Sequence, residues 1–297
     1  MNSPRTLLGS FVLGLTLVPA LAAPVVAQTP VPPPAAQAVV PSPKLAGIAH
    51  VALRVKNLDA SVAFYERLGF VKAFALSRDG AVYEAFIKIN DRQYLELYPV
   101  DAKNTQIGFL HLCFEGKDLP AVHDYYVQHG LTPKDVRTAG AGNLLFTMPG
   151  PASPTGPQNM EYTQYMPGSL HSKDFGQHLG AERIGDLMTG MRLAVDDPAG
   201  AKAFYLTKLG FDAVAGSESA VALPGNPEEK IEFAPKLPQG FRSAIMLQVT
   251  DLASTANVLS QRGIKPAEKT AKGITIADPD GNEIVLTPKM APAVAMR

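Results

Sequence analysis

The chain has 297 residues, enough for one large domain or two modest ones with a hydrophobic core each. Its 27 basic and 27 acidic residues cancel, so no overall charge attracts it to nucleic acid or to an anionic membrane. Hydrophobic residues make up 46% and charged residues 18% of the chain, which is typical of a globular protein. The single cysteine, Cys113, excludes a disulfide within the chain.

Residues 1–27 have the pattern of an export signal. Arg5 precedes an apolar run at 7–18, and alanines follow at 20, 22, 23 and 27. The run is shorter than the ~20 apolar residues that a membrane-spanning helix needs. We expect cleavage after Ala23 or Ala27, giving a periplasmic or secreted protein without stable membrane insertion; an uncleaved anchor is the alternative. The Pro- and Ala-rich residues 28–45 predict an extended linker.

Two internal similarities divide the rest of the chain into four modules. Residues 49–70 resemble residues 189–211, and residues 109–133 resemble residues 243–266. Each stretch predicts a strand, a capped helix and a glycine at the helix end. The expected caps are Asn57 or Asp59, Asp118, Asp197 and Asp251, and the glycines are Gly69, Gly130, Gly210 and Gly263. Further β-like segments follow each helix.

The opening strands of modules one and two each carry a histidine at the same position. His50 alternates with apolar residues that are expected to pack under the helix, and it shares its face with Ala52 and Arg54. His111 alternates in the same way and shares its face with Cys113 and Glu115. One strand histidine is usually only a core or surface residue, but two at equivalent points of a repeat favour a common role.

A carboxylate near the end of each of these modules completes the set. Glu96 shares a strand face with Tyr94 and Tyr98, and Glu161 alternates with apolar neighbours in the last strand of module two. If both modules curve around one hollow, these two carboxylates meet His50 and His111. Two imidazoles with one or two carboxylates suit a divalent ion such as Zn, Ni, Fe or Mn.

These motifs resemble the vicinal oxygen chelate superfamily, which includes glyoxalase I, fosfomycin-resistance proteins, methylmalonyl-CoA epimerase and extradiol dioxygenases. The matching segments are IAHVALRV, AFYERLGF, YLELY, FLHLCF and NMEYTQY. The resemblance spans residues 46–290 and implies an α+β fold of four βαβββ modules, paired into two half-barrel domains. We expect an N-terminal domain at 46–167 with the metal site, a connecting segment at 168–187 and a C-terminal domain at 188–290.

The second pair of modules departs from the metal pattern. Aligned on the strands, Gly190 corresponds to His50, Glu232 to Glu96, Ala244 to His111 and Val285 to Glu161. A single carboxylate does not hold a metal tightly, so we expect the C-terminal domain to be degenerate and metal-free.

The connecting segment contains His171 and His178. On a helix this spacing would separate them by two turns, ~10 Å, which is too far for one metal ion. Gly176 between them also disfavours a helix. We expect a linker packed across the first domain with histidines on its surface; the alternative is a lid that brings one of them near the hollow.

The resemblance implies that the metal binds two neighbouring oxygens of a substrate. Glyoxalases and epimerases use a His/Glu/His/Glu site in which a glutamate is also the base, which assigns this role to Glu161 and leaves Glu96 a ligand. Extradiol dioxygenases need only two histidines and a carboxylate on Fe(II), here His50, His111 and Glu161. The presence of Glu96 disfavours that alternative, and two-pair dioxygenases usually keep their metal in the C-terminal pair.

The expected export disfavours glutathione and CoA thioesters as substrates, because both are largely cytosolic. The sequence therefore favours a glyoxalase-like lyase or isomerase that acts on another small oxygen-rich molecule, as a monomer or homodimer. A non-enzymatic binding or resistance protein is a further alternative. Expected substrate contacts are Arg54, Tyr94 and Tyr98. Tyr162 and Tyr165 are further aromatic residues that could line a pocket, but scattered aromatic residues are more often packing residues, which is the favoured interpretation.

Overall fold

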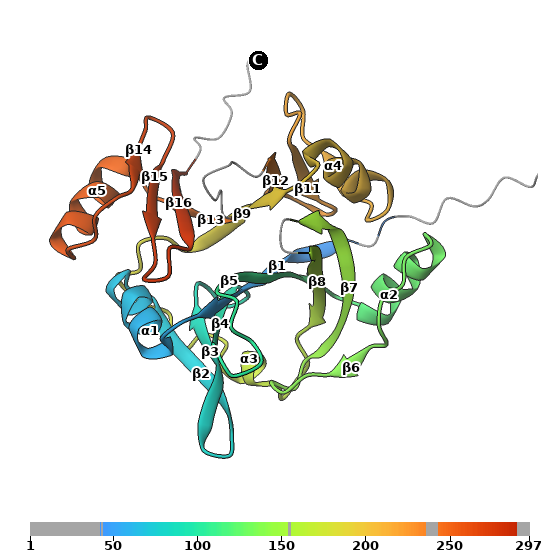
Figure 1. Ribbon diagram of the computed structural model, residues 1–297, viewed down its shortest axis with the longest axis horizontal. Coiled ribbons are helices and arrows are strands. Elements are labelled where there is room, and N and C mark those ends of the chain that lie inside the picture. The colour runs from blue at the N-terminus through green and yellow to red at the C-terminus, as the bar shows by residue number, and fades with distance from the viewer. Residues whose placement is uncertain (1–41, 43, 154–155, 236–242, 290–297) are drawn as a thin grey trace, which may run out of the picture. The chain divides into compact units, whose positions relative to one another are not determined.

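Two eight-stranded mixed sheets form the structure, a computed structural model that describes residues 42, 44–153, 156–235 and 243–289 (Figure 1). The proposed export signal and nearly all of the proposed linker lie outside these residues. Among the described residues, no helix is long and apolar enough to cross a membrane.

The first sheet comes from modules one and two. Module one consists of β1 (Leu45–Val55), α1 (Leu58–Arg67), β2 (Val71–Arg78), β3 (Ala81–Lys88) and β4 (Tyr94–Pro99). Module two consists of β5 (Gly108–Gly116), α2 (Leu119–Gln128), β6 (Arg137–Thr138), β7 (Leu144–Ser153) and β8 (Gly156–Gln164). The strand order is β2-β3-β4-β1-β5-β8-β7-β6, so the opening strands of the two modules are neighbours at the centre.

The second sheet repeats this order with modules three and four. Module three consists of β9 (Leu187–Val195), α4 (Pro198–Thr207), β10 (Asp212–Ala213), β11 (Ala220–Leu223) and β12 (Asn226–Pro235). Module four consists of β13 (Ala244–Val249), α5 (Leu252–Gln261), β14 (Glu268–Lys269), β15 (Ile274–Ala277) and β16 (Glu283–Pro288). The predicted α+β fold of four βαβββ modules in two curved sheets is confirmed.

The four long helices begin and end at the residues that the repeat indicated. Asn57, Asp118, Asp197 and Asp251 each accept a backbone N–H of the first helical turn. Gly69, Gly130, Gly210 and Gly263 have φ between 65° and 86°, the left-handed backbone that closes a helix.

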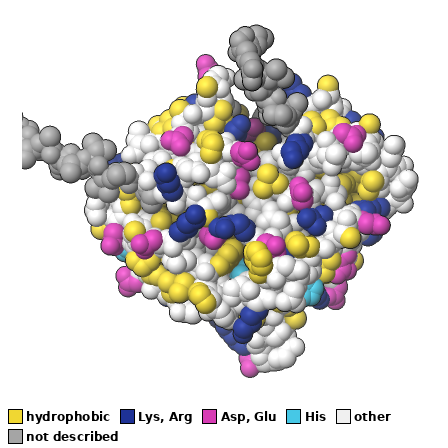
Figure 2. Space-filling model, turned by 180° about the vertical axis from the view of Figure 1, so that it is seen from behind, with side chains coloured by type: hydrophobic (Ala, Val, Ile, Leu, Met, Phe, Trp, Pro, Cys, Tyr) yellow, Lys and Arg dark blue, Asp and Glu magenta, His cyan; other side chains and the backbone are white. Residues whose placement is uncertain are grey.

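One continuous apolar core lies between the sheets and these helices. Strand residues that alternate with the site residues, such as Val51 and Leu112, point into it. The core passes from the first sheet to the second, where the rings of Phe114 and Phe211 lie 5.3 Å apart. Both sheets therefore belong to one compact unit. On the face shown in Figure 2, acidic and basic side chains are interspersed.

The end of α1 is covered closely by the connecting segment. Ile184 donates its backbone N–H to the carbonyl of Leu68 at 2.9 Å. A Cβ added to Gly69 would lie 2.2 Å from the carbonyl oxygen of Glu182, whereas one added to Gly130 would meet nothing within 4 Å. The two glycines thus share a backbone conformation but differ in their surroundings.

We expect Gly69→Ala to destabilise the protein more than Gly130→Ala. The left-handed backbone costs each variant about 1–2 kcal/mol, and the clash with Glu182 adds about 1–3 kcal/mol for Gly69 alone. Urea unfolding of the two variants measures the difference. Equal losses of stability would contradict the close packing of the connecting segment on α1.

Candidate metal centre

The four predicted metal residues lie on the four central strands of the first sheet. Backbone register brings them together in two groups. Ala52 on β1 is opposite both Glu96 on β4 and His111 on β5. Cys113 on β5 is opposite both His50 on β1 and Glu161 on β8. In each group a small side chain lies between two larger ones, so their polar ends have room to approach one another.

Short distances join these side chains around His50. Its Nε2 lies 3.1 Å from Nε2 of His111 and 3.3 Å from Oε1 of Glu161. Its Nδ1 lies 3.1 Å from Oε1 of Glu96, whose Oε2 is 3.9 Å from Nε2 of His111. The structure therefore brings all four predicted residues together.

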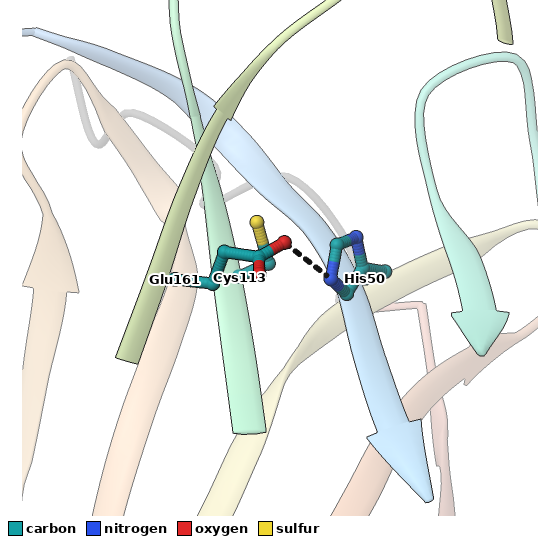
Figure 3. A group of neighbouring side chains, drawn as sticks. All are labelled: His50, Cys113 and Glu161. Carbon is teal, nitrogen blue, oxygen red and sulfur yellow. Dashed lines mark ion pairs between the residues drawn. The ribbon is translucent and has the colours of Figure 1, made fainter. Parts of the chain in front are cut away.

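Among the described residues, two overlapping groups have the spacing of metal ligands. One donor atom each from His50, Glu96 and His111 lie within 4.8 Å of one another. The same holds for His50, Cys113 and Glu161, which are drawn in Figure 3 with the carboxylate directed at the imidazole. His50 belongs to both groups.

A third carboxylate, Glu84 on β3, was missed by the sequence analysis. The Tyr98 hydroxyl lies 2.7 Å from Oε1 of Glu84 and 3.0 Å from Oε2 of Glu96. The two carboxyl groups also hydrogen-bond to each other, which requires a proton on one of them. Glu84 shares a strand face with Phe86 and Lys88 on β3, so the face assignment applied to the other strands could have found it.

Burial and charge act differently on the three carboxyls. Burial raises the pKa of Glu96, and the charges of Glu84 and Glu161 raise it further. Burial also raises the pKa of Glu84, against the hydrogen bond from Tyr98. For Glu161 the effect of burial is outweighed by His111 and His50, which lower its pKa to about 2. Glu161 is therefore ionised at neutral pH.

The residues fit a divalent cation. Nδ1 of His50 is buried and has no hydrogen-bond partner, although Glu96 is near. Burial lowers the pKa of His111 to about 4, so its imidazole is neutral and has a free lone pair at neutral pH. The buried cation Lys88 pairs with Asp91 and Asp174, and Arg92 pairs with Glu115, so neither neutralises this cluster.

The residues predicted to contact substrate have different surroundings. Tyr98 is in the carboxyl network, and Arg54 is half-buried on β1 opposite Tyr98. Tyr94 is fully buried and donates to Oδ2 of Asp174 at 3.1 Å, so it anchors the connecting segment. Tyr162 packs on Phe114 and Phe146 in the core under the helices, so it is one of the packing aromatics and does not line the pocket.

The expectation of a surface histidine at 171 was also wrong. His171 lies on the short helix α3 (Leu170–Lys173) and is only 2% exposed. Its ring packs on Phe74, Phe86, Tyr94 and Tyr165. These rings lie on the side of the sheet that carries His50 and Glu96. His178 is beyond the helix, has φ of 51° and pairs with Asp174. No sequence signal distinguishes these two histidines, because burial of His171 depends on the path of the segment across the sheet.

A pocket of about 290 Å³ lies beside the connecting segment. Arg92 and Glu115 line one part of it and His171 and Phe175 another. Glu115 follows His111 and Cys113 on the same face of β5. The pocket therefore adjoins the side of the sheet that carries the candidate metal ligands.

In the second sheet the register confirms the predicted correspondence. Gly190 is opposite Lys230, as His50 is opposite Tyr94, and Val285 is opposite Met246, as Glu161 is opposite Cys113. The remaining carboxylate, Glu232, accepts from Nε of Arg192 at 3.2 Å. It is thus neutralised by a side chain of its own sheet.

The model of the Glyoxalase/Bleomycin resistance protein/Dioxygenase superfamily matches residues 47–160 and 183–286. The chain belongs to this superfamily. No curated protein matches the sequence. Among solved structures, that of a catechol 2,3-dioxygenase matches this chain with a TM-score of 0.60 and 17% sequence identity. The match covers 86% of this chain and 91% of that chain.

Two further superfamily structures show the same fold. The Mn(II)-bound glyoxalase from Novosphingobium aromaticivorans has a TM-score of 0.60 at 15% identity, with 84% and 83% of the two chains covered. Homoprotocatechuate 2,3-dioxygenase from Arthrobacter globiformis has a TM-score of 0.56 at 16% identity, with 85% and 82% covered. At these identities the likeness establishes the fold and leaves the reaction open.

We expect Glu96→Gln to lower the affinity for Mn(II) by at least about tenfold while changing metal-free stability by less than about 0.5 kcal/mol. The amide resembles the protonated carboxyl that burial favours in the metal-free protein. Because binding must displace that proton, the affinity of the wild type should also fall as the pH is lowered. Calorimetric titration and urea unfolding measure these effects.

Glu232→Gln is the matched control, since it removes the equivalent carboxylate of the second sheet. It should leave Mn(II) affinity unchanged. If both variants bind Mn(II) like the wild type, Glu96 is a structural residue of the sheet.

Proposed function

We propose that the protein is an exported, metal-dependent lyase or isomerase of the glyoxalase type, acting on a small oxygen-rich substrate. One observation carries the proposal. His50, Glu96 and His111 form a ligand group, and the ionised carboxylate of Glu161 lies beside it, 3.3 Å from Nε2 of His50. A metal position with an adjacent carboxylate base is what abstraction of a proton next to a carbonyl requires.

In this proposal the residues have separate tasks. His50, Glu96 and His111 hold a divalent ion, Zn, Ni, Fe or Mn, which as a Lewis acid would stabilise negative charge on substrate oxygens. Glu161 accepts the carbon-bound proton, and its ionised state at neutral pH makes it available for this. Tyr98 and Glu84 orient Glu96 through their hydrogen bonds, as residues that hydrogen-bond to a metal ligand commonly do.

An Fe(II)-dependent extradiol dioxygenase is the second candidate. It is favoured by the ligand group itself, because two histidines and one carboxylate form the facial triad of non-haem iron oxygenases. In that case Glu161 would complete the surroundings of the iron or replace Glu96 as its carboxylate. A non-enzymatic protein that binds a small molecule at the candidate metal centre is the third candidate, and it requires no proton acceptor.

We expect the purified chain to bind one divalent ion, measured by elemental analysis after separate loading with Mn, Fe(II), Zn and Ni. His50→Ala and His111→Ala should both reduce binding. Glu161→Gln should retain the ion but lose at least about a hundredfold in hydrogen–deuterium exchange at carbon, measured by NMR on a panel of small hydroxy-carbonyl compounds.

The outcomes separate the three candidates. A wild type that binds no metal under any loading contradicts both enzymatic candidates. Oxygen uptake by the Fe(II) form with a panel of catechols, without carbon–deuterium exchange, would favour the dioxygenase. Bound metal with neither activity would favour the binding protein.

We also propose that the mature protein begins near residue 28, in the periplasm or outside the cell. The support is the apolar run at 7–18 with its following alanines. Expression of the full chain in a bacterium with a periplasm should give a periplasmic product that starts after Ala23 or Ala27, as read by N-terminal sequencing. An intact N-terminus in the membrane fraction would favour an uncleaved anchor.

A further inference from the structure

We infer that Cys113, His50 and Glu161 form a second metal position that selects thiophilic divalent ions and cannot be filled together with the first. The first position is the one formed by His50, Glu96 and His111. The inference rests on the proposed function in one respect, that the first position binds a divalent ion.

The second position has three donors of different chemistry on three neighbouring strands. Cys113 is fully buried on β5, between His50 on β1 and Glu161 on β8. Donor atoms of the three residues lie within 4.8 Å of one another. Ligands of one Zn²⁺ at ~2.0–2.3 Å lie at most ~4.6 Å apart, so small side-chain movements suffice to close the group on an ion.

The thiol lies next to the Glu161 carboxylate, one of the other two donors. Figure 3 shows the Glu161 carboxylate directed at His50, with Sγ of Cys113 beside that carboxylate. The thiol proton is directed at the backbone carbonyl oxygen of Phe114, which lies 3.8 Å from the sulfur. A bound ion would replace that proton, forming a metal–sulfur bond and releasing the proton to the buffer.

The ligand types determine which ions are preferred. Thiolate sulfur favours soft or borderline ions such as Cd²⁺ and Zn²⁺, whereas carboxylates and imidazoles without sulfur also suit Mn²⁺. The first position has no sulfur. The repeat makes the contrast clear, because Ala52 occupies in module one the place that Cys113 occupies in module two.

Sharing of His50 makes the two positions exclusive. A neutral imidazole offers one nitrogen lone pair and therefore binds one ion. An ion in the second position would also occupy Glu161, which is the base in the proposed function. Thiophilic ions would then displace Mn²⁺ from the first position and block the base.

The test titrates the purified chain with Mn(II) and Cd(II). Because Cys113 is the only cysteine of the chain, any thiolate-to-cadmium absorption band reports on this residue alone. We expect Cd(II) to produce this band at one ion per chain and to release bound Mn(II), which is measured by electron paramagnetic resonance. Absence of the band in the wild type, or one Cd(II) and one Mn(II) bound together, overturns the inference.

Three variants separate the positions. Cys113→Ala should lose the band and at least about tenfold in Cd(II) affinity, with unchanged Mn(II) affinity. His111→Ala should do the reverse, losing Mn(II) affinity and keeping the band. His50→Ala should lose both. If Cys113→Ala retains the wild-type Cd(II) affinity, the second position does not exist.

Failure of this inference differs from failure of the proposed function. Mn(II) binding without a thiolate band leaves the proposed function intact and removes the second position. A thiolate band in a chain that binds no divalent ion at the first position keeps the second position and removes the proposed function. Should Cys113→Ala fail to fold, the band and the Mn(II) displacement in the wild type still decide the question.

Discussion

The side of the first sheet that carries His50 and His111 buries more acidic groups than its own cations balance. Glu84, Glu96 and Glu161 lie around two histidines, and the nearby cations Lys88 and Arg92 are paired with other carboxylates. Burying an unpaired carboxylate is costly, and proteins avoid the cost by protonation, pairing or metal binding. The metal-free protein protonates the Glu84–Glu96 pair and pairs Glu161 with His50. A divalent cation would replace both arrangements.

The second sheet has the same backbone without this constraint. Gly190 and Ala244 replace the histidines, and the one remaining carboxylate, Glu232, has Arg192 as a partner. Its strands still contribute to the continuous core and contact the first sheet. For example, the Glu229 carboxylate of β12 accepts the backbone N–H of Ile48, two residues before His50. The degenerate modules therefore support the strand that carries the shared ligand.

Local rules predicted most of the fold and the four central site residues. Helix caps, terminal glycines and strand alternation depend on neighbours in sequence, and the repeat fixed which strands were equivalent. Glu84 was within reach of the same alternation but lay on a strand without a repeat partner of similar sequence. His171 and Tyr94 were not predictable, because their burial depends on how the connecting segment crosses the sheet. That path is fixed by long-range contacts such as the ion pair of Lys88 with Asp174.

Unequal burial indicates the side from which a substrate would reach the proposed site. His50 and Glu96 are 2% and 4% exposed and are backed by the network of Tyr98 and Glu84. His111 and Glu161 are each 9% exposed. The latter two lie on β5 and β8, and β5 continues through Cys113 to Glu115 at the pocket beside α3. A base must touch the substrate, whereas a metal ligand need not. Of Glu96 and Glu161, Glu161 is the more exposed. Exposure and charge thus both favour Glu161 over Glu96 for the proposed proton transfer.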